Sequence, residues 1–231
     1  MDLPVALLGG TGKLGPGLAM RLARAGVPVL IGSREAEKGV AAAAEINDKL
    51  QATQVAFTRV EGMDNGWAAL RARVAVITVP YEGQRGMLPA LAESLAGKVV
   101  ISTAVPMRFE EVVGPVHLDV PEGSAAQQVK ALLPRSHVAA GFHSVSSAEL
   151  KRLSKTLDEH VIITGDDDEG KRTAMELVRL LPGARPVDGG RLHCARYSEQ
   201  LTVLLLSVNS IYRTHAGIRL TNLPPDPQNE G

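Results

Sequence analysis

The stretch "VALLGGTGKLGPGLAMRLARAG", residues 5–26, decides the fold of this chain. Its opening is apolar and stops at a pair of glycines, a pattern typical of a buried parallel strand. Apolar residues then recur at Leu14, Leu18 and Leu22, a helical period that closes at Gly26. A strand, a glycine-rich turn and a helix in this order predict the first unit of a doubly wound α/β sheet.

The glycines of this turn have the spacing of a dinucleotide-binding loop. Gly10, Gly12 and Gly15 form G-x-G-x-x-G between the predicted strand and helix. Gly10 allows a tight turn, Gly12 lets a pyrophosphate approach the backbone, and Gly15 permits close packing of the helix on the strand. Free N–H groups at the start of the helix would bind the anion. The alternative is a glycine-rich turn that holds no ligand.

The end of the second predicted strand, "VPVLIGS", favours NADP over NAD. NAD-specific folds carry an acidic residue at this point, whereas an arginine suits a 2′-phosphate. Here Ser33 and Arg34 follow the strand, and Lys38 lies one helical turn further on the same side. All three can bind a phosphate. The alternative is that Arg34 and Lys38 are solvated charges that pair with Glu35 and Glu37.

The rest of the chain continues the alternation of strands and helices. Buried strands are expected at 55–62, 74–80, 98–106 and 136–145, and helices at 34–50, 65–73, 86–97 and from Ser124 onward. Another strand and helix follow after about Leu150, and then a long helix within 194–217. We predict a Rossmann-type doubly wound parallel sheet in residues 1–150, a small C-terminal α/β domain in 151–223 and a flexible tail in 224–231.

Composition removes several classes of function. The 231 residues balance 25 basic against 25 acidic side chains, which argues against a general nucleic-acid or anionic-membrane surface. The single cysteine, Cys194, excludes an internal disulfide framework and a cysteine-rich metal site. With no signal peptide or membrane span in the pattern, a cytoplasmic protein is expected. The acidic run Asp166–Glu169 is interpreted as a helix start, and no metal site is expected.

Over nearly its whole length the chain resembles the F420-dependent NADP reductases, small enzymes that pass hydride between NADP and the deazaflavin coenzyme F420. The likeness is carried by the segments "VALLGGTGKLGPGLAMRLA", "IGSREAEK", "VITVPYEG", "SAAQQVKALL", "GFHSVSSAEL", "TGDDDEGKR" and "ARPVDGGRLHCARYSEQLTVLLL". The last three are the specific ones, since a generic Rossmann domain would not carry them. The resemblance implies NADP and coenzyme F420 as small-molecule partners, and the apolar helix face Leu201–Val208 is a candidate surface for a homodimer.

The resemblance also implies roles for individual residues. Thr11, Gly12, Lys13 and Leu14 would line the pyrophosphate; Ser33, Arg34 and Lys38 the 2′-phosphate; Val79 and Val105 the ribose and nicotinamide; His143, Val145 and Ser147 the cleft where the two rings stack. Catalysis would come from holding two flat rings face to face, so no catalytic side chain is assigned. In one departure, the run His143–Ser147 lacks the proline typical of the family, which predicts a less rigid loop and a more polar pocket.

Two other functions stay open. One is an NADPH-dependent reductase of another flavin or of a small carbonyl compound, a chemistry that needs a proton donor near the nicotinamide. His143 is the only evident candidate for that donor. The other is a protein that senses NADP without turnover.

Overall fold

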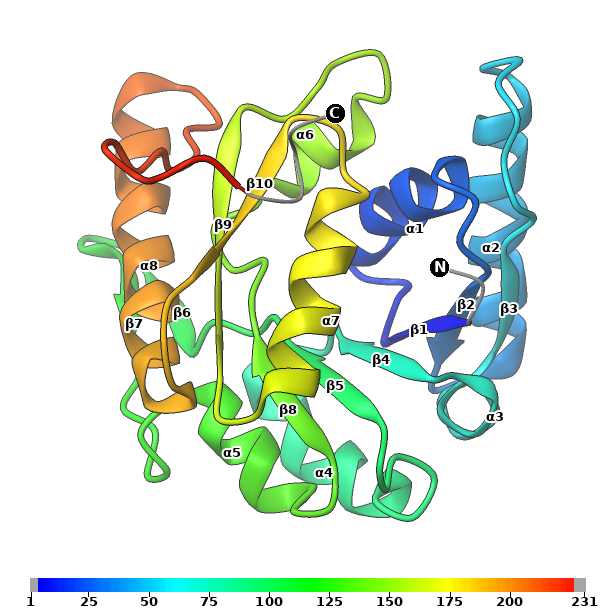
Figure 1. Ribbon diagram of the computed structural model, residues 1–231, viewed down its shortest axis with the longest axis horizontal. Helices are drawn as coiled ribbons and strands as arrows, with labels where there is room; N and C mark the ends of the chain where they lie inside the picture. Colours follow the sequence, from blue (N-terminus) through cyan, green and yellow to red (C-terminus); the bar gives the residue numbers. More distant parts are fainter. Residues whose placement is uncertain (1–3, 227–231) are drawn as a thin grey trace.

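An eight-stranded sheet forms the centre of the molecule. The computed structural model describes residues 4–226, and the strands follow the order β10-β9-β8-β5-β4-β1-β2-β3 (Figure 1). They span Val5–Leu8 (β1), Val29–Ser33 (β2), Glu61–Asp64 (β3), Val74–Ile77 (β4), Val99–Ser102 (β5), His137–Ala140 (β8), Glu159–Gly165 (β9) and Ala184–Asp188 (β10). Neighbours are parallel except β8 and β9, which pair antiparallel. The predicted doubly wound sheet is confirmed.

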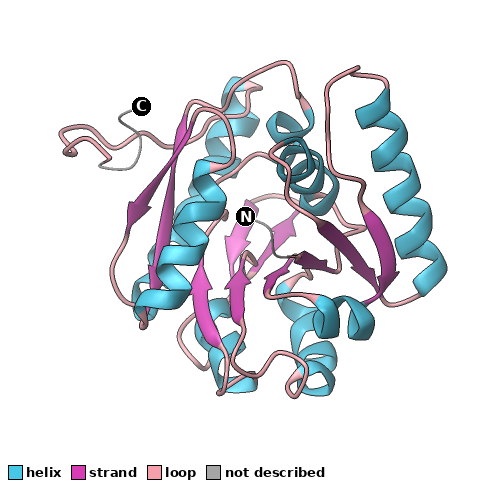
Figure 2. Ribbon diagram, turned by 45° about the vertical axis from the view of Figure 1, so that its right-hand side comes forward, coloured by secondary structure: helices cyan, strands magenta, loops and turns pink. Residues whose placement is uncertain are grey.

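Helices cover both faces of this sheet (Figure 2). They span Leu14–Arg24 (α1), Ala36–Gln51 (α2), Asn65–Arg71 (α3), Tyr81–Leu91 (α4), Ala125–Leu132 (α5), Ser147–Lys151 (α6), Asp168–Arg179 (α7) and Ala195–Tyr212 (α8), with a short 3-10 helix η1 at Leu192–Cys194. Successive residues of β1 pack into two separate cores. Val5 and Leu7 contact the core under α1, α2 and α7, whereas Ala6 and Leu8 contact the core under α3, α4 and α5. Burial on both faces explains why the strands are apolar without alternation.

The order of the strands reverses between β1 and β4. From β1 the chain moves outward through β2 and β3, whereas β4, β5 and β8 are added on the other side. The loops that leave the carboxyl ends of β1 and β4 therefore diverge and open a crevice at this point. In open α/β sheets such a switch point is where ligands bind.

Local differences from the sequence prediction have identifiable causes. The third strand was expected at 55–62 but begins at Glu61, because the Asn47 side chain of α2 pairs with both backbone groups of Val60, each at 2.9 Å. That backbone is thereby satisfied without a sheet neighbour. The stretch after β5, for which the sequence analysis predicted no strand, holds an antiparallel hairpin of β6 (Met107–Glu110) and β7 (Gly114–His117). The acidic run does start a helix, since Asp167 caps α7 by accepting from the Gly170 N–H at 2.7 Å.

The C-terminal part of the chain extends the same sheet. β9 pairs with β8 and with β10, and the division into units 1–150 and 151–223 stays a prediction. The predicted flexible tail, 224–231, is described as far as Asp226, whose carboxylate pairs with Arg179 of α7 at 3.0 Å. Residues 227–231 lie outside the described part of the chain.

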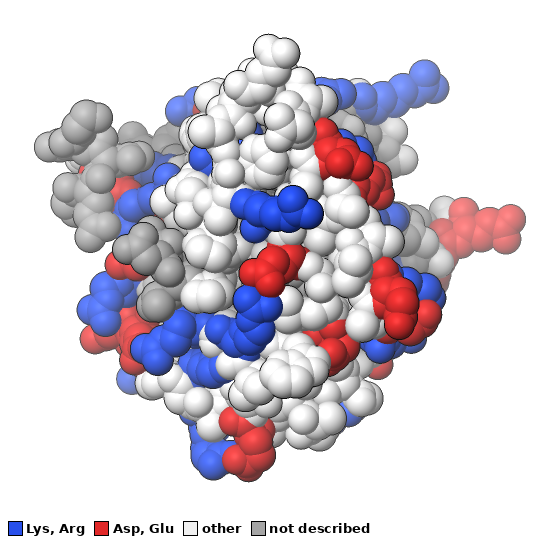
Figure 3. Space-filling model, turned by 90° about the vertical axis from the view of Figure 1, so that its right-hand side faces the viewer, with Lys and Arg blue, Asp and Glu red and all other residues white. Residues whose placement is uncertain are grey.

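Charges of both signs are mixed on the surface. On the face drawn in Figure 3, lysines and arginines lie beside aspartates and glutamates instead of gathering into one patch. Within the described residues, no helix combines the length and apolar character needed to cross a membrane.

Candidate functional site: a pocket at the switch point

The glycine-rich loop connects β1 to α1 and is held by backbone hydrogen bonds. Gly9 turns the chain with a positive φ of 73°. The Gly10 N–H donates to Leu7 O at 3.0 Å and to Gly32 O at 2.9 Å, and the Gly12 N–H donates to Gly9 O at 3.2 Å. These bonds tie the loop to both β1 and β2. The loop is therefore preformed.

The glycines differ in what a side chain would meet. At Gly9 a Cβ would overlap Val79, and at Gly15 it would overlap Gly10 O, so both positions exclude side chains for reasons of packing. At Gly12 the nearest atom to a Cβ is Gly9 O at 3.5 Å, an ordinary contact. The space beside Gly12 is thus open toward the exterior, so a ligand could approach the protein backbone there.

The N–H groups at the start of α1 have no side-chain cap. Lys13 stands at the N-cap and makes no capping hydrogen bond, and the first turn carries no acidic residue. Thr11, Gly12 and Lys13 are exposed. An α-helix has several N–H groups without partners at this end, and its dipole favours an anion there.

A pocket of about 1180 Å³ extends from this loop. Its lining comes from the ends of β1, β2, β4 and β5, from the starts of α1, α2 and α3, and from one side of α4 along its whole length: Gly9, Thr11, Gly12, Lys13, Leu14, Ser33, Arg34, Glu35, Lys38, Asn65, Thr78, Val79, Pro80, Glu82, Gly83, Gly86, Met87, Ala90, Leu91, Thr103 and Ala104. The pocket therefore occupies the switch point of the sheet, and it brings together seven of the residues that the sequence analysis proposed for the cofactor in the two loops, plus Val79.

The corner of the pocket after β2 is basic, but its two cations differ. The Arg34 side chain is exposed and makes no ion pair or hydrogen bond with any residue of 4–226. Lys38 pairs with Glu35 at 2.6 Å, and this ammonium lowers the pKa of the Glu35 carboxyl. Ser33 is buried, and its Oγ accepts weakly from the Glu35 N–H at 3.4 Å. Arg34 is thus free for a ligand, whereas Lys38 is partly neutralised by a neighbouring acid.

Asn65 is a site residue that the sequence analysis missed. It is 7% exposed, and its Oδ1 accepts from the Gly9 N–H at 3.0 Å, so it fixes the first residue of the loop. Asn65 follows Asp64, which caps α3 by accepting from the Trp67 N–H at 3.0 Å. The sequence pattern there indicates a helix start and hides a contact 56 residues away.

Six predicted residues lie beyond the lining of this pocket, and two of them are the buried loop glycines Gly10 and Gly15. Val105 follows Ala104 at the end of β5 and is half-buried. Val145 is 6% exposed and belongs to the core under α1 and α7, and Ser147 opens α6. His143 follows β8 and is 8% exposed.

His143 is held neutral beside α8. Its Nδ1 lies 3.2 Å from Ser198 Oγ, and its Nε2 has no partner among residues 4–226. Burial lowers the pKa of His143 to about 4, so the imidazole is uncharged at neutral pH. An imidazole in this state is a poor proton donor, although it can still donate or accept one hydrogen bond.

Other buried polar atoms lack partners around the junction of α5, α8 and the β6–β7 hairpin. Gln127 Oε1, Arg196 Nε and His117 Nε2 are buried without a hydrogen bond in the described chain. Arg196 and Gln127 flank Gly123, where a Cβ would overlap the Arg196 guanidinium. α8 is anchored to α5 by Glu199, which accepts from the Ala125 and Ala126 N–H groups at 3.0 and 3.2 Å. Unpartnered groups of this kind indicate a missing hydrogen-bonding partner.

A metal site has no support in the described residues. Within 4–226, no three His, Cys, Asp or Glu side chains are arranged to hold an ion.

Comparison with known proteins finds relatives whose names include NADP, which is consistent with a dinucleotide pocket at this place. Residues 4–106 match the family described as coenzyme F420-dependent NADP oxidoreductases. The chain is 38% identical over 228 residues to the F420-dependent NADP reductase of Methanothermobacter marburgensis, covering 96% of this chain and 100% of that one. It is 35% identical to the F420-dependent NADP reductase of Methanocaldococcus jannaschii, with 96% and 99% covered. A crystal structure from Arthrobacter sp. FB24 superposes with a TM-score of 0.77 at 24% identity, over 93% of this chain and 96% of that one, which supports the fold.

Proposed function

The chain belongs to the coenzyme F420-dependent NADP oxidoreductases, and on that premise we propose that the switch-point pocket binds NADP(H) for hydride exchange with coenzyme F420. The observation that carries the proposal is the union of a preformed glycine loop and an unpaired Arg34 in one pocket. The loop and the free α1 N-terminus would hold the pyrophosphate, and Arg34 with Ser33 the 2′-phosphate. Val79 and Val105 would border the nicotinamide.

The second ring would lie between this pocket and the start of α8. Hydride passes directly between ring carbons when both cofactors are bound. The chain's own contribution is to place the rings and exclude water, for which the buried His143 and the unpartnered Gln127 and Arg196 are suited. Val145 and Ser147 would not touch the ring themselves but would hold the His143 loop in place, because Val145 is itself in the core. In this arrangement residues 151–223 close one side of the cleft through α8.

The state of His143 favours ring-to-ring transfer over carbonyl reduction. Reduction of a carbonyl needs a proton donor near the nicotinamide. With a pKa of about 4, His143 carries no extra proton to give at neutral pH. Carbonyl reduction would require His143 to donate a proton, whereas hydride transfer between two rings would not.

The test combines the protein with NADPH and one acceptor at a time while the nicotinamide absorbance is followed. We expect oxidation of NADPH with coenzyme F420, and little or none with riboflavin or with simple aldehydes and ketones. His143→Ala should keep measurable turnover, and Ser144→Ala, a change in the same loop at a residue with no assigned role, serves as the control. Rapid carbonyl reduction without a deazaflavin would refute the proposal, and NADPH binding without turnover on any acceptor would favour the sensing function.

We also propose a homodimer formed through α8. Tyr197, Leu204, Ile211 and Tyr212 of this helix are 60–74% exposed, an unusual amount of apolar surface for one helix. Light scattering should give twice the chain mass, and Leu204→Lys together with Ile211→Lys should give the single-chain mass. A single-chain mass for the unchanged protein would contradict the dimer.

A cytoplasmic location is proposed as well, since both cofactors are small soluble molecules of the cell interior. Fractionation of the native host should place the protein with the soluble cytoplasmic fraction. Recovery outside that fraction would contradict it.

A further inference from the structure

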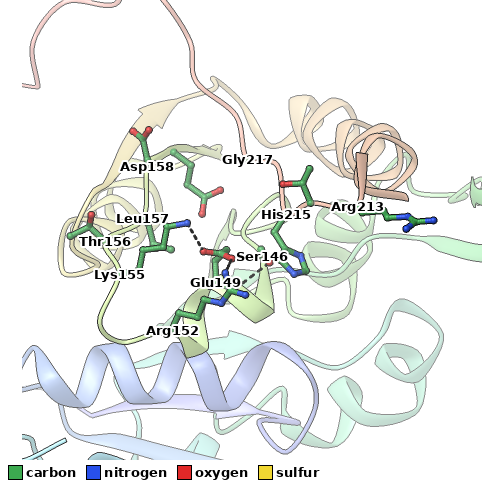
Figure 4. A pocket seen from close by; sticks show the side chains of 12 residues that line it. Ser146, Glu149, Arg152, Lys155, Thr156, Leu157, Asp158, Arg213, His215 and Gly217 are labelled. Atoms are coloured by element: carbon green, nitrogen blue, oxygen red, sulfur yellow. Dashed lines mark hydrogen bonds and ion pairs between the residues drawn. The ribbon is translucent and has the colours of Figure 1, made fainter. Parts of the chain in front are cut away.

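A second cavity, of about 370 Å³, lies away from the nucleotide pocket and shares no residue with it. It opens between the loop that leads from α6 to β9 and the segment that follows α8 (Figure 4). Its lining is polar: Ser146, Glu149, Arg152, Lys155, Thr156, Leu157, Asp158, Glu159, Arg213, Thr214, His215 and Gly217. Neither the hydride transfer nor the nucleotide site uses any of these residues.

Both walls of the cavity are fixed by internal hydrogen bonds. On one side the buried Arg21 of α1 donates to the backbone oxygens of Glu149, Leu150, Arg152 and Lys155 at 2.9–3.1 Å. On the other side Asn209 Oδ1 accepts from the Ala216 N–H at 2.7 Å, and Ile218 O accepts from the His160 N–H at 2.7 Å. A ligand would therefore enter a preformed site and would lose little free energy in ordering it.

The floor of the cavity is a carboxyl group without a donor. Glu159 is 7% exposed, lines the cavity, and has no hydrogen bond or ion pair with any residue in the described part of the chain. Gly217 lets the chain pass close above it, because a Cβ there would lie 2.7 Å from Glu159 Oε2. Burial without a donor makes the Glu159 carboxyl costly to ionise, and a ligand that brings an ammonium would lower that cost.

The charges that face Glu159 explain its titration. Burial and the Glu149 carboxylate of α6 raise the pKa of Glu159 to about 7, while Arg21 of α1 acts in the opposite direction. His215, Arg152 and Lys155 border the same cavity. At neutral pH the floor is thus partly protonated and ready to ionise when a cation arrives.

The mouth of the cavity carries cations suited to an anionic group. Arg152 and Lys155 share the Glu149 carboxylate at 2.9 and 3.2 Å, so this trio keeps one net positive charge. In Figure 4 the Arg152 guanidinium and the His215 ring lie at the same end of the cavity, whereas the Arg213 side chain extends away from it. The Arg152 guanidinium has further N–H donors to offer beyond the one Glu149 uses.

We propose that this cavity is a binding site for a free α-amino acid, whose ammonium group is held by Glu159 and whose carboxylate is held at the mouth by Arg152 and His215. The Glu159 carboxyl at the floor can accept from an ammonium, and Arg152 and His215 at the mouth can donate to a carboxylate, so the cavity offers each end of a small zwitterion a partner of the right kind. Neither a simple amine nor a simple carboxylate satisfies both ends. The site is independent of the nucleotide pocket, so it stands whether or not the second substrate is a deazaflavin.

The first experiment adds the standard L-amino acids one at a time to the full-length protein at millimolar concentration and records the melting temperature, followed by calorimetric titration of any that raise it. We expect at least one to bind, and its decarboxylated amine and deaminated acid to bind at least tenfold more weakly. Loss of the ammonium contact in Glu159→Gln should weaken binding by about 10- to 150-fold, the equivalent of a charge-assisted hydrogen bond. Glu176→Gln, an exposed change on α7, is the matched control.

A second measurement uses the unchanged protein and does not depend on any variant folding. Because the bound ammonium stabilises the ionised carboxylate, binding should release protons below about pH 7, and the affinity should rise as the pH increases through that value. Titrations in two buffers of different ionisation enthalpy measure the release. The proposal is overturned if no amino acid binds, if the amine alone binds as tightly, or if binding neither releases protons nor responds to Glu159→Gln.

Discussion

Replacement of Arg34 by alanine is expected to separate the two nicotinamide cofactors. Arg34 lines the pocket and has no ion-pair partner among residues 4–226, so its guanidinium is available to a 2′-phosphate. A charge-assisted hydrogen bond contributes about 1.5–3 kcal/mol, which corresponds to about 10- to 150-fold in dissociation constant. Arg34→Ala should weaken NADPH binding by that factor and leave NADH binding nearly unchanged, because NADH carries no 2′-phosphate.

The charges of Lys38 and Glu35, next to Arg34, should also affect NADPH binding, but by smaller factors. Lys38 is paired with Glu35, and the two side chains are 64% and 57% exposed. An exposed pair of this kind contributes little to stability, but Lys38 must share its charge with that acid. Lys38→Ala should therefore weaken NADPH by only about two- to fivefold. Glu35→Gln should tighten NADPH by a similar factor, since it frees Lys38 and removes a negative charge from the corner of the pocket.

The assay is a set of dissociation constants for NADPH and NADH, measured for the unchanged protein and the three variants at low and high salt. Lys49→Ala is the matched control, because Lys49 lies on the same helix, pairs with Glu45 and is absent from the nucleotide pocket. The effect of Arg34→Ala should shrink at high salt, where the attraction is screened. Equal losses for NADH and NADPH would mean that Arg34 supports the fold and does not recognise the phosphate.

Three further predictions concern the glycine loop, the Asn65 contact that holds it, and the contact between α8 and α5. Gly12→Val should abolish NADPH binding in a folded protein, and unchanged affinity in that variant would refute the assignment of the phosphate loop. Gly15→Ala should instead lower the melting temperature, because its Cβ would overlap Gly10 O. Asn65→Ala should weaken NADPH and NADH alike by about fivefold, the equivalent of about 1 kcal/mol for the lost contact to Gly9, and a loss confined to NADPH would contradict this role. Burial raises the pKa of Glu199 to about 7, so its ionisation disfavours the folded state, and its contribution should make the free energy of unfolding about 0.8 kcal/mol smaller at pH 8 than at pH 6.5. Urea titrations at both pH values should show this decline, and Glu199→Gln should flatten it; an equal slope in the variant would remove Glu199 as the cause.

The sequence alone was sufficient for the features that depend on local pattern. The strand, loop and helix of residues 5–26 follow from apolar runs and glycine spacing, which are properties of neighbouring residues. The starts of α5 at Ser124 and of α7 within Asp166–Glu169 were also predicted from the sequence. Both depend on a local contact, because the cap accepts from an N–H three residues away. The basic corner at Ser33 and Arg34 lies at the end of a strand that its apolar run predicted.

Tertiary structure decided the features that depend on residues far apart in the chain. Nothing near Asn65 indicates that its amide holds Gly9, since that contact exists only once α3 packs beside β1. The antiparallel addition of β9 to β8 depends on hydrogen bonding between strands and not on their apolar pattern, which is the same in both directions. The pKa values of His143 and Glu159 likewise result from burial, a property that the finished packing imposes and that no single stretch of the sequence contains.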